Sequence, residues 1–248
     1  MAPKPMKVLS NADELLSMLA ERGPLSPAEL ARVIDMPRPS VYRLIEALAV
    51  VDLVSIAGDG RAQLGRANLH FAESALRDIP ELVAARPAMA ALAASTGQTA
   101  YFCVRRGDRI VCVDWVQGER VSLMALTPGN SLPLHAGATS RALAASDPSL
   151  LDSLDPAIPL EAFTPFTLTS RQDLAEDARE IHERGYSVSD QDVTIGVAAI
   201  GAVIVDEAGA IRGAISIAGL REQVLAIADQ AGAELVAAAR SIGAALPR

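Results

Sequence analysis

The chain of 248 residues contains only two cysteines, Cys103 and Cys112. A disulfide framework or a zinc site needs more cysteines than this, so we expect two free thiols. The sequence also lacks an apolar run of about eighteen residues, the length that crosses a bilayer, and its first residues lack the apolar core of a signal peptide. We therefore expect a soluble, cytoplasmic protein without a membrane partner.

Signatures of catalysis and of metal binding are missing as well. The Gly-x-Ser-x-Gly nucleophile elbow of hydrolases does not occur, and His135 lies near Ser140 only in sequence. The histidines His70, His135 and His182 are far apart and show no metal-ligand spacing. We expect no catalytic residue, no metal and no cofactor, and we expect His135 to be a structural hydrogen-bonding group.

Half of the residues are apolar, and the length is sufficient for two domains. The formal net charge is −8 and the sequence pI is about 4.9, which at first argues against a nucleic-acid partner. However, residues 1–75 carry eight Lys and Arg against nine Asp and Glu, a net charge of −1. DNA binding by this nearly neutral part depends on which face its arginines occupy.

The stretch SPAELARVIDMPRPSVYRLIEAL predicts two short helices joined by a tight turn. Ser26, Pro27 and Glu29 form a helix start, because a hydroxyl caps a free N–H, proline needs none and the carboxylate reaches back. Pro37 ends this first helix at about residue 34. The second helix, over about residues 38–50, has a buried stripe at offsets of three, four and seven: Val41, Leu44, Ile45 and Leu48.

The opposite face of the second helix is polar, as a recognition helix in the major groove requires. Arg43 can pair with guanine or phosphate, and Glu46 can accept a hydrogen bond from cytosine. The residues expected at DNA are Pro27, Arg38, Pro39, Ser40, Tyr42, Arg43, Glu46 and Arg61. An ordinary helical hairpin with a solvated outer face is the alternative interpretation.

The flanking segments favour a winged form of this helix-turn-helix. After a loose arm that ends at Ser10, Asn11 is expected to cap a helix over residues 12–22. Behind the second helix, two short strand patterns flank an Asp59-Gly60 turn, which predicts a hairpin with Arg61 at its tip. Three helices followed by a hairpin form a winged helix-turn-helix.

The C-terminal part predicts an antiparallel sheet with helices packed around it, an α+β fold. TAYFCVRR, RIVCVDWVQ and RVSLMAL indicate a three-stranded meander. If Gly107 and Asp108 are the central turn residues, Cys103 lies directly across from Cys112. Further strands are expected over residues 186–190, 197–205 and 211–219. Helices are expected over residues 66–76, 78–95 (kinked or divided by Pro87), from Ala138, over 148–154, 171–184 and 221–246.

Four stretches together resemble the isocitrate-lyase-regulator (IclR) type of bacterial transcription factors: MPRPSVYRLIEAL, LPLHAGATSRALAA, LTSRQDLAEDAREIHERGYSVSDQD and IGVAAIGAVIVDEAGAIRGAISIAG. The resemblance covers essentially the full length. It implies a winged helix-turn-helix domain at residues 1–65, a linker helix at 66–78 and a GAF-like effector domain at 79–248. It also implies a homodimer or homotetramer that binds a partly palindromic operator in double-stranded DNA, for example as a repressor.

The resemblance further implies an effector against the loop of residues 135–141. Unpaired backbone N–H groups at Ala138 and Thr139, beside the positive end of a helix dipole, would seat a carboxylate, so we expect a small organic acid. Apolar walls are expected from Val121, Met124 and Leu132. At positions that match the family's polar contacts the sequence has Ser189 or Asp190, Ala199, Ser216 and Ala218.

Three of these positions depart from some relatives: Ser189 replaces an acid, Ala199 a cysteine and Ala218 a serine. Smaller and less polar side chains favour a roomier, more apolar pocket and therefore a larger carboxylate, such as an aromatic one. A tightly packed helix start without a ligand is the alternative for this loop. For the whole chain, the alternative is a small-molecule-binding enzyme or carrier whose winged helix serves as a protein-interaction domain.

Overall fold

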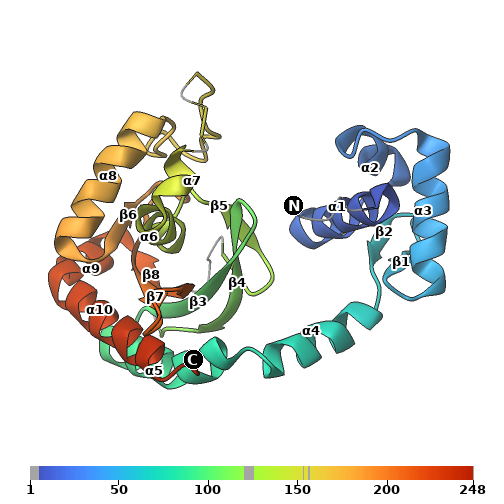
Figure 1. Cartoon of the computed structure of the whole chain (residues 1–248). Coiled ribbons are helices and arrows are strands. Elements are labelled where there is room, and N and C mark those ends of the chain that lie inside the picture. The colour runs from blue at the N-terminus through green and yellow to red at the C-terminus, as the bar shows by residue number, and fades with distance from the viewer. Residues whose placement is uncertain (1–5, 120–125, 153, 156, 248) are drawn as a thin grey trace. The chain divides into compact units, whose positions relative to one another are not determined.

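A computed structural model describes residues 6–119, 126–152, 154–155 and 157–247. The chain forms two compact units, Met1–Asp78 and Ile79–Arg248, and each has its own core (Figure 1). Among the described residues, no helix is both long enough and apolar enough to cross a membrane.

The N-terminal unit is a winged helix-turn-helix, as predicted. It contains α1 (Lys7–Arg22), α2 (Pro27–Val33) and α3 (Arg38–Val50), followed by an antiparallel hairpin of β1 (Val54–Ile56) and β2 (Ala62–Leu64). The three helices and the hairpin share one apolar core, and its fully buried members are Leu15, Leu30, Val41, Val54 and Ala62.

The predicted start of the first helix was wrong. α1 begins at Lys7, so residues 7–10 are helical rather than a loose arm, and Asn11 lies inside the helix instead of capping it. The prediction relied on the capping preference of asparagine and on the first inward-facing leucines. The first turn carries no such signal, because its apolar residues Val8 and Leu9 are exposed and Met6, at the N-cap, makes no side-chain capping bond.

Two further helices come before the sheet. α4 (Ala67–Arg77) has no buried residue, and exposes Leu69 and Phe71. α5 (Pro80–Thr96) contains Pro87 and is nevertheless one helix. Of the two predicted possibilities, a kinked helix and two separate helices, the structure therefore has the single helix. It ends at Gly97, whose left-handed conformation is easily adopted by glycine.

The C-terminal unit is built on a six-stranded antiparallel sheet in the order β5-β4-β3-β8-β7-β6. Its strands are β3 (Thr99–Arg106), β4 (Arg109–Val116), β5 (Ser131–Pro133), β6 (Ser187–Asp190), β7 (Val197–Val205) and β8 (Ile211–Leu220). Cys103 pairs directly with Cys112, as the turn at Gly107 predicted, and both thiols are free and buried. Most of the third strand predicted for the meander, residues 120–125, lies outside the described residues.

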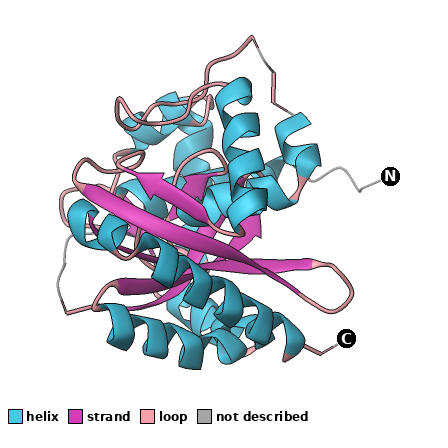
Figure 2. Ribbon diagram, turned by 90° about the vertical axis from the view of Figure 1, so that its left-hand side faces the viewer, coloured by secondary structure: helices cyan, strands magenta, loops and turns pink. Residues whose placement is uncertain are grey.

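Helices cover both faces of this sheet (Figure 2). α6 (Ala138–Ser146) and α8 (Arg171–Arg184) lie over one face, and α5 and α10 (Ala228–Ala244) lie over the other (Figure 1). The short helix α7 (Pro148–Asp152) follows α6. The predicted single helix over residues 221–246 was wrong, because Ile227 leaves helical geometry (φ −113°, ψ 11°) and separates α9 (Arg221–Ala226) from α10.

Candidate functional site

The outer face of α3 is the candidate DNA-contacting surface. Its inner stripe is buried, whereas six candidate side chains on its outer surface are exposed: Arg38, Pro39, Ser40, Tyr42, Arg43 and Glu46. Within the described part of the chain, no hydrogen bond or ion pair holds the side chains of Arg38, Tyr42, Arg43 or Glu46. These groups are therefore free to donate to and accept from a partner molecule.

The turn before α3 is fixed by the chemistry of α2. The Ser26 hydroxyl accepts from the Glu29 amide (3.3 Å), and the Glu29 carboxylate accepts from the Ser26 amide (2.8 Å), which is a complete capping box. The Ser26 hydroxyl also donates to the Glu29 carboxylate at 2.6 Å. This bond, followed by the one from the Ser26 amide, lowers the pKa of the Glu29 carboxyl. Pro27 is half-buried in the first turn, so its ring is only partly available to a partner.

The predicted Asp59-Gly60 turn is shifted by one residue: the Gly60 amide donates to the Ala57 carbonyl, so Gly58 and Asp59 form the tip of the wing. Arg61 therefore lies just after the turn and not at its tip. The guanidinium folds back on its own unit. Its Nη1 donates to the Pro24 carbonyl at 3.3 Å, and its Nε lies 3.6 Å from an Asp59 oxygen. Arg61 is about half-exposed, and its charge is partly compensated by Asp59.

A cation that the sequence analysis did not single out lies beside the outer face of α3. Lys7, in the first turn of α1, lines a surface groove together with Asn11, Ser40 and Arg43. Lys7 is not among the predicted DNA-contacting residues, because the sequence predicted a loose arm at this position. The groove brings two positive side chains from two helices to one surface.

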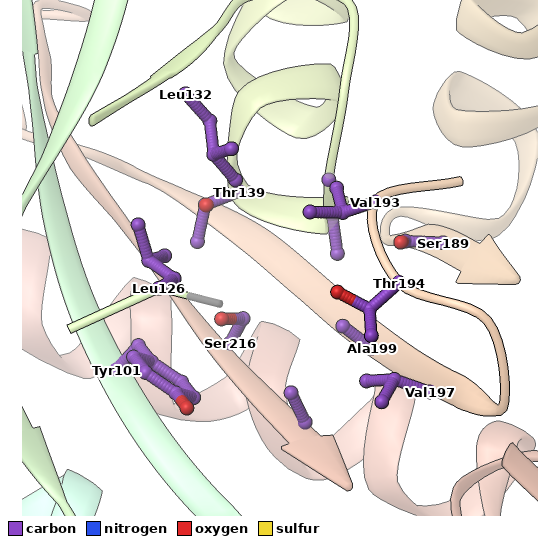
Figure 3. A pocket seen from close by; sticks show the side chains of 13 residues that line it. Tyr101, Leu126, Leu132, Thr139, Ser189, Val193, Thr194, Val197, Ala199 and Ser216 are labelled. Atoms are coloured by element: carbon purple, nitrogen blue, oxygen red, sulfur yellow. The ribbon is translucent and has the colours of Figure 1, made fainter. Parts of the chain in front are cut away.

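A cavity in the C-terminal unit lies between the start of α6 and the sheet, and encloses about 500 Å³, including its open mouth (Figure 3). The structure brings seven of the predicted effector residues together in its wall: Leu132, Ala138, Thr139, Ser189, Ala199, Ser216 and Ala218. Residues that the sequence analysis did not name complete the wall: Tyr101, Leu126, Gly137, Val193, Thr194 and Val197. None of these lining residues is charged, and most of the exposed wall is apolar.

Three predicted residues are not found in this wall. Val121 and Met124 lie outside the described residues. Asp190, the alternative to Ser189, does not line the cavity, because alternate residues of β6 point to opposite sides and its carboxylate pairs with Arg221 at 2.6 and 2.8 Å. Of the two alternatives, the structure therefore places Ser189, and not Asp190, at the cavity.

The start of α6 presents backbone amides to the cavity. Gly137 precedes the helix with a positive φ of 86°, which glycine adopts without strain. The amides of Ala138 and Thr139 in the first turn have no hydrogen-bond acceptor among the described residues. Gly201 of β7 allows the close contact beneath them, since a Cβ there would lie 2.8 Å from the Ala138 carbonyl carbon and 3.0 Å from the Thr139 nitrogen.

A carboxylate of the chain itself lies at the edge of this helix start. Asp192, which is 1% exposed, accepts a hydrogen bond from the Gly137 amide at 3.0 Å and from the Ser189 hydroxyl. It also pairs with Arg141 Nη1 at 3.1 Å. Sequence reasoning missed Asp192, although it lies in the SVSDQD motif, because the motif does not show which acidic residue turns inward.

Arg141 compensates the negative charge behind the cavity. It is 7% exposed and forms a two-pronged ion pair with the buried Asp177 of α8, in addition to its bond with Asp192. These carboxylates together raise the pKa of the Arg141 guanidinium, although burial alone would lower it. The arginine is thus fully engaged, which leaves the cavity wall without a free cation in the described residues.

Tyr101 contributes to the cavity wall a hydroxyl group that the sequence did not predict there. Its side chain is 2% exposed, and its hydroxyl has no hydrogen-bond partner in the described part of the structure. Burial is the main factor that raises the pKa of this phenol. The nearby Thr99 side chain acts in the opposite direction, although it does not reach hydrogen-bond geometry with the Tyr101 hydroxyl. Tyr101 therefore stays protonated at physiological pH.

The structure gives no support to a hydrolytic arrangement among the described residues. His135 Nε2 is bonded to the backbone carbonyl of Glu161 at 2.8 Å, which is a structural role. The buried Ser140 hydroxyl has no partner, so it is not activated by a histidine. No group of three metal-binding side chains is found where the structure is described.

Comparison with known proteins assigns the chain to a family. The family model for the "IclR helix-turn-helix domain" matches residues 8–55, and the model for "Bacterial transcriptional regulator IclR C-terminal" matches residues 74–244. The HTH-type transcriptional repressor AllR of Escherichia coli strain K12 is 29% identical over 224 residues, which cover 88% of this chain and 82% of AllR.

Solved structures agree with this assignment at the level of the fold. An IclR transcriptional regulator from Alicyclobacillus acidocaldarius has a TM-score of 0.80 and 21% identity, with 98% of this chain and 99% of that chain covered. An IclR homologue from Microbacterium hydrocarbonoxydans, solved in complex with 4-hydroxybenzoate, has a TM-score of 0.75 and 18% identity, with 97% and 99% covered. The chain belongs to the IclR family of bacterial transcriptional regulators, whose N-terminal domain is a helix-turn-helix.

Proposed function

We propose that this chain is a ligand-responsive regulator whose α3 helix, residues 38–50, enters the major groove of an operator. The observation that carries this proposal is the free polar face of α3, with Arg43 and Glu46 exposed and unpaired among the described residues. Arg43 is assigned to a guanine or a phosphate and Glu46 to a cytosine. The phosphate backbone beside these bases is assigned to four residues: Arg38, Pro39, Ser40 and Tyr42. Pro27 and Arg61 are assigned to the edges of the same DNA-contacting surface.

The operator is proposed to be partly palindromic. A homodimer, alone or within a homotetramer, would hold two copies of α3 about one turn of DNA apart. AllR is named a repressor, and we propose the same action for this chain. A regulator of chromosomal genes works in the cytoplasm, where we place it.

The effector is proposed to be a small organic acid bound in the cavity beside α6. Its carboxylate would accept hydrogen bonds from the amides of Ala138 and Thr139, at the positive end of the helix dipole. Seven predicted residues that line the cavity would contact it, from Leu132 to Ala218. The acid bound by the Microbacterium hydrocarbonoxydans homologue, 4-hydroxybenzoate, supports this class of ligand.

The resident carboxylate of Asp192 is compatible with an anionic ligand. Arg141 and the Ser189 hydroxyl satisfy its oxygens, so the charge of Asp192 is compensated within the protein. A ligand held by amides and hydroxyls, without an ion pair to a free side chain, gains specificity from geometry more than from charge. We therefore place the effector's carboxylate on the first turn of α6.

The test is a DNA-binding titration by fluorescence anisotropy with the DNA that flanks the gene of this protein. The Arg43→Ala variant should lose about 1 to 3 kcal/mol of specific binding if Arg43 pairs with guanine. Arg179→Ala is the matched control, because Arg179 is exposed on α8 in the other unit. Equal affinity and equal sequence preference of the wild type and Arg43→Ala would refute the role assigned to α3.

A further inference from the structure

Tyr101 has an unusual position for a buried phenol. It lies on β3, directly opposite Ser216 of β8, and Ser216 in turn lies opposite Gly201 of β7, on which the first turn of α6 rests. These three residues form a row across the sheet beneath the cavity. Adjacent strands are about 4.8 Å apart, so the row spans roughly 10 Å from the α6 amides to the backbone of Tyr101.

We infer that Tyr101 is a specificity-determining residue of this cavity, and that the effector is a ring-sized apolar monocarboxylic acid with an oxygen atom at the end remote from its carboxylate. The inference rests on the proposed effector site and specifies its ligand. In this arrangement the carboxylate binds the Ala138 and Thr139 amides, and the remote oxygen pairs with the Tyr101 hydroxyl.

The unpaired state of the hydroxyl carries the inference. A buried hydroxyl without a partner lowers the stability of a protein, and native proteins contain few such groups. If the hydroxyl pairs with the ligand, ligands that carry a matching polar atom bind more tightly than ligands that lack it. Other hydroxyls also line the cavity. Ser216 lies directly across from Tyr101, whereas Thr139 and Thr194 come from other parts of the wall. Figure 3 shows Thr139 and Tyr101 on opposite sides of the cavity, with Leu126 and Ser216 between them.

The remaining wall defines the middle of the ligand. Between the two polar ends the cavity is lined by aliphatic side chains, including Leu126, Leu132, Val193 and Val197, and by no charged side chain among the described residues. An apolar body is favoured there, because a second charge would be desolvated without a counter-charge. The hydroxyl oxygen of Tyr101 is buried, and Leu126 packs against the cluster that contains Tyr101, so the proposed pairing requires a small displacement of Leu126 or of the ring.

The experiment compares two probes of nearly equal size, 4-hydroxybenzoate and 4-methylbenzoate, by isothermal titration calorimetry against the full-length wild type and Tyr101→Phe. The wild type should bind 4-hydroxybenzoate about tenfold more tightly, since its hydroxyl satisfies the phenol and a methyl group does not. In Tyr101→Phe this preference should vanish or reverse, while the affinity for 4-methylbenzoate is retained or rises.

Tyr186→Phe is the matched control. The Tyr186 hydroxyl donates to Asp229 at 3.0 Å, away from the cavity, so this variant should keep the tenfold preference and lose thermal stability. Tyr101→Phe removes an unpaired group and should not lose stability.

Three results would overturn the inference. If the acids bind and their ratio is the same in Tyr101→Phe, Tyr101 does not select the ligand, although the proposed effector site stands. If Tyr101→Phe melts as far below the wild type as Tyr186→Phe does, its hydroxyl has a structural partner. If neither acid binds the wild type, the proposed acid class fails together with the inference.

Discussion

Replacement of Arg141 by methionine tests whether the buried ion pairs hold the effector unit together. The arginine is 7% exposed, donates to Asp177 through Nε at 2.8 Å, to Asp192 through Nη1 at 3.1 Å and to the Val188 carbonyl through Nη2 at 3.0 Å. Methionine has a similar length and no charge, so it fills most of the space and removes these bonds.

The expected loss is large because two carboxylates stay behind. Asp177 is 8% exposed and Asp192 is 1% exposed, so neither can regain full hydration. Breaking a buried ion pair by removal of one partner costs about 3 to 5 kcal/mol. For a unit of this size, at roughly 2 to 4 °C for each kcal/mol, the melting temperature should fall by about 10 °C.

The single tryptophan makes the measurement specific. Trp115 lies on β4, so its fluorescence follows the unfolding of the effector unit and not of the winged helix-turn-helix. Arg171→Met is the control, since Arg171 forms an exposed ion pair with Asp152 and its loss should change stability by less than about 1 kcal/mol.

The stability lost in Arg141→Met also depends on the two carboxylates that Arg141 pairs with, Asp177 and Asp192. Addition of Asp192→Asn to Arg141→Met should recover part of the lost stability, because it removes the carboxylate that has lost its cation, whereas Asp177 still lies 4.0 Å from Arg184. A melting temperature within about 2 °C of the wild type for Arg141→Met, or a further decrease on addition of Asp192→Asn, would refute this account of the network.

Three other predictions follow from single contacts. Gly201→Ala should destabilise the effector unit by about 1 to 3 kcal/mol and weaken acid binding in calorimetry, because its Cβ would press on the start of α6. Ser26→Ala should cost the N-terminal unit about 1 kcal/mol at neutral pH in urea denaturation. Since Ser26 lowers the pKa of Glu29, the carboxylate's stabilising contribution is present above its unfolded pKa near 4.5, and the difference between wild type and variant should shrink as pH falls below that value. Cys103 and Cys112 are fully buried. Hydrogen bonding with Cys103, followed by burial, raises the pKa of the Cys112 thiol, so iodoacetamide should label both thiols only after unfolding. Rapid labelling of the folded chain at pH 7 would contradict this prediction.

Local chemistry explains which parts of the fold could be predicted. The boundaries of α2 follow from the Ser26 capping box, and those of α8 from Ser170 at its start and Gly185 at its end. The register of β3 with β4 follows from the turn at Gly107 as far as the pair of Cys103 with Cys112, because a two-residue turn fixes the pairs next to it. An irregularity between Phe102 and Cys103 then shifts the remaining pairs by one residue. Signals of this kind act within a few residues and need no knowledge of the remaining chain.

The errors occurred where no local signal marks the boundary. The start of α1 carries no side-chain cap, and the break at Ile227 contains neither proline nor glycine. A periodic apolar pattern continues through such a break, so the sequence predicted one helix where the structure has two.

The cavity shows a further limit. The family resemblance located seven lining residues, but Tyr101 becomes a lining residue only through the pairing of β3 with β8, which are more than a hundred residues apart. The same holds for Asp192, which approaches Gly137 and Arg141 from the loop between β6 and β7. The alternation of β3, with Tyr101 and Cys103 on the same face, was the one sequence signal that could have pointed to the tyrosine.

The family resemblance implies an acid at the position of Ser189, and in this chain the carboxylate beside that position comes from Asp192. The Ser189 hydroxyl donates to the Asp192 carboxylate, so a negative charge is present near this position but is turned towards Arg141 and the Gly137 amide. The cavity itself is left neutral in its described wall, and an acid can bind there without facing an uncompensated carboxylate. Because Ser189 and Gly137 belong both to the cavity wall and to this network, a ligand that moves either residue also changes the contacts that join α6 to α8. If an acid occupies the cavity as proposed, these shared residues provide a route by which it alters the effector unit. We therefore expect Arg141→Met to lose that response while acid binding is retained.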